Sequence, residues 1–293
     1  MGVLFGLLSA LSFGISNVYW KNATRDADYA FLVLFRGVIA VVIFGLCWLL
    51  FAFYGLESIE IINRNATSFD YLNAFLICSC CSFGLFFFLK SMKYTPVSIT
   101  VTLSSVNIFG ILTTVILIGE QLTFNYLIAF SLAITGILSA QKFNWKALSL
   151  DWNKGATYAL LASLFWGVTY PLFKFLSPTI GVLPLSFILE SCVTLMAMFW
   201  ALISKKNSNP KPLFGKVQLR HYLVLALLLI GGTLFFNLAI QNLSVFNLNL
   251  IGNFQYIVSI ALAIFIYSEQ LAKHQIFGIF LIFLSIAYIQ YFI

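Results

Sequence analysis

Two ionised side chains stand inside long apolar segments of the sequence, where charge is costly and usually serves a function. Arg36 follows Phe35, and Glu190 follows Leu189. An arginine can hold an anionic group, while a carboxylate can receive an amine or carry a proton. Alternatively, the two charges form a buried ion pair, or lie close enough to helix ends to reach the interface. Under the first reading, Arg36 and Glu190 are the leading candidates for a binding site.

The segment 245–267 is mostly apolar but carries several large amides. Asn249, Asn253 and Tyr256 recur at the spacing of one helical face. Amides are costly against lipid, so they line either a cavity or a contact between helices. Their size favours a cavity, because close helix packing calls for small residues.

Four more residues extend the candidate binding surface to other apolar segments. Trp166 offers a ring face on which a planar or cationic group could stack. Gln241 follows Asn237 by one helical turn, so these two amides form either the edge of a site or hydrogen bonds between helices. The complete predicted set of substrate-binding residues is Arg36, Glu190, Trp166, Asn107, Asn249, Asn253, Tyr256, Asn17 and Gln241.

No arrangement of residues in the sequence suggests covalent catalysis or a metal site. The five cysteines fall in apolar segments, without paired histidines or a second cysteine cluster at the spacing of metal ligands. No histidine stands with serine, cysteine or aspartate in a pattern for nucleophilic chemistry. We therefore expect a protein that is not an enzyme, with no catalytic residue, no metal and no cofactor.

The elements that position these residues are predicted to be transmembrane helices. The chain has 293 residues, of which 61% are hydrophobic and 9% charged, and this excludes a water-soluble fold. Apolar runs of about 20 residues, without a period of two, favour spanning helices over a β-barrel. We expect an all-α integral membrane protein of ten spans, at 2–20, 30–54, 71–90, 95–118, 124–141, 155–176, 181–203, 221–241, 245–267 and 273–293.

The net charge of +7 does not indicate a nucleic-acid partner, because lysines and arginines are scattered singly or in small groups between apolar runs. They are typical of topology determinants. Most of them follow spans one, three, five, seven and nine. The excess of positive charge on cytoplasmic loops then predicts that both termini lie outside.

An internal repeat divides the chain into two related halves. Residues 85–89 match 234–238, and residues 120–122 match 269–271. Each half holds five spans, which is an odd number, so the second half must enter the membrane from the opposite side. We therefore expect an inverted-topology repeat, with one half at 1–147 and the other at 148–293. In alternating-access carriers, such halves meet at a substrate site near the bilayer midplane.

Four short segments carry a resemblance to a known family: Gly119-Glu120-Gln121-Leu122, Ser268-Glu269-Gln270-Leu271, the turn Phe165-Trp166-Gly167 and the link Tyr94-Thr95-Pro96. With these segments the sequence resembles the drug/metabolite transporter superfamily, and within it the ten-helix EamA-type carriers, over essentially its full length. The sequence departs from the family pattern at Asn107 and Tyr256, where a proline is common, and at Phe13, where a tryptophan is common. The resemblance implies transport of amino acids, nucleotide sugars, sugar phosphates or drugs. It also implies that both termini lie in the cytoplasm, in conflict with the loop charges.

Together these features predict a secondary transporter, more specifically an exporter, of a small polar metabolite such as an amino acid or amine. It would work by alternating access around a central cavity. The alternatives are a nucleotide-sugar or drug/cation carrier of the same fold, or a membrane-embedded enzyme or a receptor. The expected partners are a small-molecule substrate, the lipid bilayer and protons as a coupling ion, with the chain a monomer or homodimer. The expected location is a bacterial inner membrane.

Overall fold

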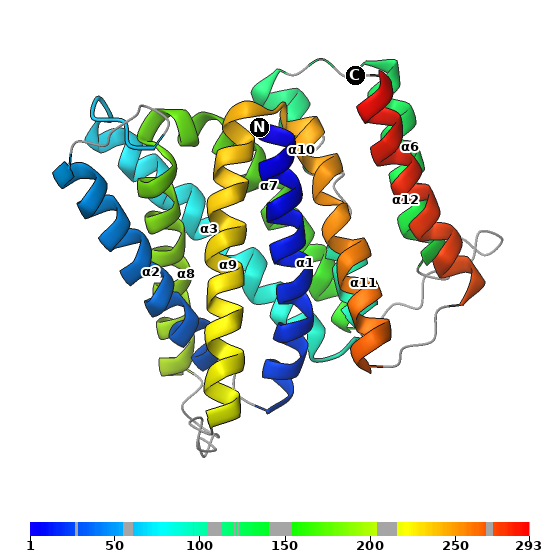
Figure 1. The fold of residues 1–293 in the computed structure, drawn as a ribbon, viewed down its shortest axis with the longest axis horizontal. Coiled ribbons are helices and arrows are strands. Elements are labelled where there is room, and N and C mark those ends of the chain that lie inside the picture. Colours follow the sequence, from blue (N-terminus) through cyan, green and yellow to red (C-terminus); the bar gives the residue numbers. More distant parts are fainter. Residues whose placement is uncertain are drawn as a thin grey trace.

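A computed structural model of the chain describes residues 1–26, 29–54, 61–95, 97–104, 110, 113–119, 121, 123–140, 154–203, 216–267 and 272–292. The regular elements among these residues are all helices, as expected (Figure 1). The first half contains α1 (Gly2–Asp26), α2 (Tyr29–Tyr54), α3 (Ser68–Met92), α4 (Val97–Ser104), the π-helical turn η1 (Thr114–Ile118) and α6 (Phe124–Ala140). The second half contains α7 (Lys154–Ile180), α8 (Val182–Ile203), α9 (Lys216–Asn242), α10 (Val245–Gly252), α11 (Phe254–Tyr267) and α12 (Lys273–Phe292).

The helices follow the order of the ten expected spans. Within the described residues, seven helical stretches are long and apolar enough to cross a membrane, and shorter apolar helices accompany them. One of the seven, Val245–Ile266, lies where the ninth span was expected, and a turn divides it into α10 and α11. At the division, the backbone N–H of Asn253 bonds to the carbonyl of Leu250, which tightens the chain into a turn.

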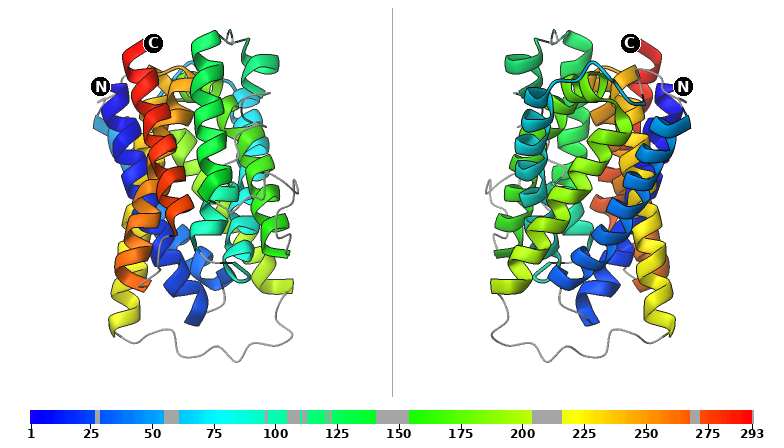
Figure 2. Two further views of the ribbon diagram at one scale, coloured as in Figure 1. Left: turned by 90° about the vertical axis from the view of Figure 1, so that its right-hand side faces the viewer. Right: turned by 90° about the vertical axis from the view of Figure 1, so that its left-hand side faces the viewer.

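Helices of the two halves alternate around the centre of the molecule. The strongest helix pairs are α1 with α9, α3 with α7, α2 with α8, and α6 with α12. Figures 1 and 2 show the helices running along one common direction, with both chain termini at the same end. The helix pairs therefore join elements of the first half to elements of the second.

The first helix of each half begins at a different end of the molecule. Gly2 at the start of α1 lies against Leu243, which follows the last turn of α9. Gly155 at the start of α7 lies against Thr95, just beyond the end of α3. Because α1 ends beside the end of α3, α1 and α7 run in opposite directions.

Aromatic rings packed on glycines hold the two main helix pairs close together. A side chain at Gly232 of α9 would collide with the ring of Phe13 on α1. A side chain at Gly84 of α3 would collide with the indole of Trp166 on α7. The missing side chain lets each ring lie flat on the backbone of the opposite helix.

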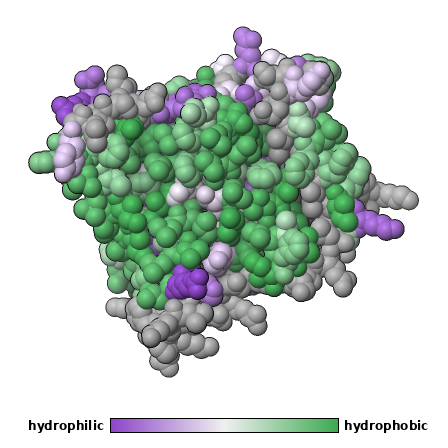
Figure 3. Space-filling model, viewed as in Figure 1, coloured by the Kyte–Doolittle hydropathy of each residue, from purple (hydrophilic) through white to green (hydrophobic). Residues whose placement is uncertain are grey.

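The outer surface is a broad apolar belt. Figure 3 shows hydrophobic side chains over the middle of the visible face, with hydrophilic residues toward its upper and lower edges. Large side chains such as those of Leu49, Phe53 and Phe265 are 68%, 84% and 83% exposed. Such continuous apolar exposure fits contact with lipid.

Candidate functional site

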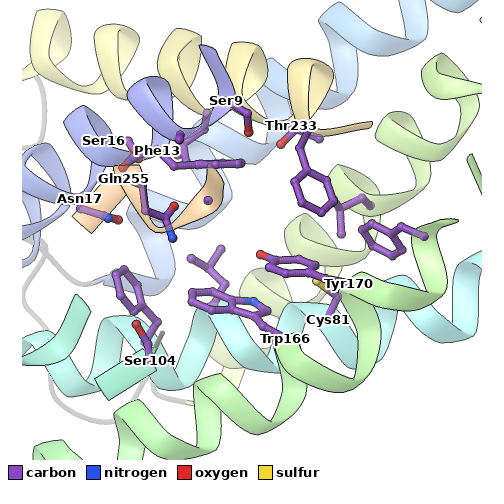
Figure 4. A pocket seen from close by; sticks show the side chains of 18 of the residues that line it. Ser9, Phe13, Ser16, Asn17, Cys81, Ser104, Trp166, Tyr170, Thr233 and Gln255 are labelled. Carbon is purple, nitrogen blue, oxygen red and sulfur yellow. The ribbon is translucent and has the colours of Figure 1, made fainter. Parts of the chain in front are cut away.

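A cavity of about 160 Å³ lies at the centre of the bundle. Its walls come from both halves of the chain, namely from α1, α2, α3 and α4 and from α7, α8, α9, α10 and α11. Figure 4 shows aromatic, hydroxyl and amide side chains converging on this space. The volume is below the roughly 300–1,000 Å³ of drug-sized ligand sites, so in this conformation it suits a small molecule.

One wall of the cavity is aromatic and comes mainly from α7. Trp166 and Tyr170 stack with ring centroids 5.9 Å apart, and Phe88 of α3 packs on Trp166 at 5.2 Å. Phe13 of α1 and Gln255 of α11 lie on the opposite side of the cavity (Figure 4). Flat ring faces of this kind can hold a planar or cationic group.

The two ionised residues predicted from the sequence meet at the cavity wall. Arg36 of α2 and Glu190 of α8 form an ion pair, and they are 3% and 2% exposed. The second carboxylate oxygen of Glu190 accepts a hydrogen bond of 3.2 Å from Thr233 of α9. The Nε of Arg36 is buried and has no hydrogen-bond partner. The pair is thus neutral overall, fixed by three helices and in contact with the cavity.

The wall opposite α7 is polar and comes from α1 and the α10–α11 segment. Asn17 donates to Ser259 over 3.1 Å, and Ser259 in turn donates to the backbone carbonyl of Gly14 over 3.0 Å. Asn249 and Gln255 line the cavity on the same segment. The Nδ2 of Asn249 is buried without a hydrogen-bond partner.

Six of the nine predicted binding residues are brought together at this cavity. They are Asn17, Arg36, Trp166, Glu190, Asn249 and Tyr256. Their contact with a substrate remains a prediction.

Two of the other three predicted residues, Asn253 and Gln241, are not among the described lining residues. Asn253 is buried at the turn between α10 and α11 and is not among the described lining residues. Gln241 donates over 3.0 Å to the backbone carbonyl of Ser177 and borders a second, more open pocket. Asn237 likewise bonds between helices, over 2.9 Å to Ser186. Asn107 lies outside the described residues.

Sequence reasoning missed two lining residues that matter for the site. Thr233 is a single hydroxyl in an apolar segment, yet with Asn237 and Gln241 it repeats at the four-residue spacing of one helical face. Phe13 is aligned with Trp166 by the internal repeat, and this correspondence could have pointed to it.

A lysine at the end of α1 ties that helix to α3. The Nζ of Lys21 donates to the backbone carbonyls of Met92 and Thr95 over 2.8 and 3.1 Å. The carbonyls at a helix C-terminus lack partners within the helix and carry partial negative charge, so an ammonium group stabilises them. This contact, the Lys21 clamp, lies at the end of the molecule opposite the chain termini.

The repeat-related lysine of α7 makes the same contact at the other end. The Nζ of Lys174 donates to the backbone carbonyls of Ile240, Gln241 and Leu243 over 2.9, 3.2 and 2.7 Å. These carbonyls close the C-terminus of α9, beside the start of α1. This contact, the Lys174 clamp, ties α7 to α9 at the end that holds both termini.

A membrane bundle with one cavity shared between two related halves is an architecture typical of transporters. The sequence model of the EamA-like transporter family matches residues 1–140 and 153–291. The chain belongs to the EamA-like transporter family. As an EamA-like protein it is a multi-pass membrane transporter of the drug/metabolite transporter superfamily, a family of transporters rather than enzymes.

Comparison with solved structures supports the EamA-like fold. Among 28 matching chains, one crystal structure of a protein covers 99% of this chain and 96% of its own, with a TM-score of 0.71 and 14% sequence identity. At that identity the likeness concerns the fold alone. A comparison with curated proteins gave no match.

Proposed function

We propose that this EamA-like protein is a secondary carrier that exports a small zwitterion or amine, such as an amino acid, across a bacterial inner membrane. Alternating access would move the halves 1–147 and 148–293, as an inverted repeat, around the central cavity. The observation that carries the proposal is the buried Arg36–Glu190 pair on the wall of a small cavity shared by both halves.

The antiparallel course of α1 and α7 supports the inverted repeat. The two lysine clamps support it further, because repeat-related lysines make the same contact at opposite ends of the molecule. A rotation that places each half on the other would also place the Lys21 clamp on the Lys174 clamp. Halves related in this way rock about a fixed central site in alternating-access carriers.

The clamps also suggest how each end would open. Helix α1 packs on α9, and α3 packs on α7, so each clamp joins one of these helix pairs to the other. Rocking of the pairs would break one clamp while the other holds. The cavity would then face one side of the membrane at a time.

The ion pair suits a cargo that carries both charges. A substrate carboxylate would bind Arg36, while its ammonium group would bind Glu190, so neither buried charge loses its counter-ion. An amine alone would instead leave the positive charge of Arg36 without its counter-ion unless an anion binds beside it. The small cavity disfavours the alternative of a nucleotide sugar in this conformation.

The test is counterflow in proteoliposomes with radiolabelled amino acids, amines and nucleotide sugars, with and without a pH gradient. We expect saturable exchange of a small zwitterion or amine, with no exchange of nucleotide sugars. Acceleration by the pH gradient would support proton coupling. Absence of flux for every compound would refute the carrier.

Variants of the ion pair separate cargo binding from a structural role. Arg36→Ala and Glu190→Gln each leave the partner unmatched, which costs roughly 3–5 kcal/mol for a fully buried pair, and each should lower the melting temperature and transport. The double variant Arg36→Met/Glu190→Leu removes both charges and should recover stability but not transport. Recovery of transport as well would mean that the pair only holds helices together.

A further inference from the structure

Gly252 borders the central cavity without an evident packing reason for being glycine. It is the last residue of α10, and its φ lies outside the positive range that favours glycine. A Cβ atom built on it meets no heavy atom within 4 Å. Glycine destabilises a helix relative to alanine, so the position gives up stability with no gain in packing.

Other glycines at the cavity differ in this respect. A Cβ on Gly6, which also lines the cavity, would lie 3.1 Å from the side chain of Ile251. Gly84 and Gly232 are covered by the rings of Trp166 and Phe13. Among the glycines whose surroundings the structure describes along the cavity, Gly252 therefore faces open space.

A residue from the first half of the chain shows a cavity position that carries a side chain. Ser104 belongs to α4 and Gly252 to α10, and both residues line the cavity. The hydroxyl of Ser104 donates to the carbonyl of Val101 over 2.9 Å, so its side chain is held against its own helix. A small side chain therefore fits at the cavity wall, and Gly252 has none.

We propose that Gly252 determines the size of cargo that the cavity accepts. This inference rests on the carrier function proposed above and assigns the cargo's orientation in the same site. The charged groups of a zwitterion or amine bind at Arg36 and Glu190, and its substituent extends toward α10. There the missing side chain of Gly252 provides room, and the amides of Asn249 and Gln255 offer hydrogen bonds to a polar substituent.

The test measures uptake of the labelled cargo identified for the wild-type protein. Unlabelled compounds of one homologous series, for example glycine, alanine, valine, leucine and phenylalanine, compete with it, and their potencies are compared between the wild type and the variants. Gly252→Ser adds a small side chain at this position, and Gly252→Val fills more space. We expect Gly252→Val to weaken the largest accepted competitor about tenfold while the smallest changes less than about twofold. Gly252→Ser should shift preference in the same direction by a smaller factor.

Two further variants complete the design. Ser104→Gly should enlarge the cavity at α4 and admit a larger competitor. Gly231→Ala is the matched control, because a Cβ at Gly231 makes only ordinary contacts of 3.8 Å and the residue is not among the described lining residues. It should leave the size preference unchanged.

The outcomes distinguish this inference from the carrier proposal. No flux by the wild type would refute the carrier itself. Wild-type transport with the same size preference in Gly252→Ser, Gly252→Val and Gly231→Ala would overturn the role of Gly252 alone. If Gly252→Val fails to elute as a folded monodisperse protein, Gly252→Ser decides, and an unchanged preference in that folded variant refutes the inference.

Discussion

The two ends of the molecule are closed by the same type of clamp but with different supporting contacts. The Lys174 clamp uses three backbone carbonyls, and two hydrogen bonds beside it also join α7 to α9, from Gln241 to the carbonyl of Ser177 and from Ser177 to the carbonyl of Asn237. Among the described residues, the Lys21 clamp reaches the carbonyls of Met92 and Thr95. At that end, the hydroxyls of Ser91 and Thr95 instead form hydrogen bonds that connect the end of α3 with α4 and α7.

The difference arises from substitutions at matched positions of the repeat. Asn237 and Gln241 of α9 correspond to Phe88 and Met92 of α3. Both apolar residues are buried in one cluster with Trp20. At these matched positions the end with Lys21 has apolar packing, whereas the end with Lys174 has directional hydrogen bonds. Related helices can thus close opposite faces by different physical means.

Loss of the Lys174 clamp should have the largest effect on how readily the cavity opens to one face of the membrane. Lys174→Met keeps the side-chain length but removes three charge-assisted hydrogen bonds. A loss of only about 1.4 kcal/mol from this contact would already change the ratio of open to closed conformations tenfold. Cys81 lines the cavity and can report access. In a variant whose other cysteines are alanine, we expect labelling by an impermeant thiol reagent to rise about tenfold from the face that holds the termini.

The matched control for this lysine is Lys90→Met. Lys90 contacts the ring of Tyr158 at 4.4 Å rather than a helix end. It should leave the labelling of Cys81 unchanged from both faces. Cys81→Ala should abolish the signal. Unchanged labelling in Lys174→Met would show that this end is not held by its lysine.

Loss of the Lys21 clamp should have a smaller effect, directed to the other face. Lys21→Met removes the bonds to the carbonyls of Met92 and Thr95, while the apolar cluster around Trp20 and Met92 stays in place. We expect labelling of Cys81 to rise about threefold from the face opposite the termini, since the apolar cluster continues to hold this end. An increase from the same face as in Lys174→Met would contradict gating at opposite ends. An epitope tag at the C-terminus shows which face of the membrane holds the termini and hence from which face the thiol reagent enters.

The smallest expected effect comes from removing the extra hydrogen bond at the Lys174 end. Gln241→Met introduces the residue found at the matched position of α3 and removes the bond to the carbonyl of Ser177. One neutral hydrogen bond contributes about 1 kcal/mol or less. Labelling of Cys81 from the face with the termini should therefore rise only about twofold. Equal labelling from that face in wild type and variant would mean that the clamp alone determines closure.

Part of the site could be predicted from residue types, but its boundary could not. Arg36 and Glu190 were identified because charge is rare in apolar segments, and Trp166 and Asn249 because of their type and spacing. Gln241 has the same polar character, yet it bonds to Ser177 outside the central cavity. Thr233 and Phe13 also line the cavity, although neither is charged nor a large amide. Residue type indicates that a group needs a polar partner but not which neighbour supplies it.

The sequence by itself determined the membrane class, the helix order and the relation between the halves. These follow from local quantities, namely apolar length, charge placement and recurring segments, which act within a single helix. Only the tertiary structure decided that Glu190 lies against Arg36, that Lys21 and Lys174 reach the ends of α3 and α9, and that Gly252 faces the cavity. Those contacts depend on which helices pack together, and packing depends on side-chain shape across the whole bundle rather than on any one segment.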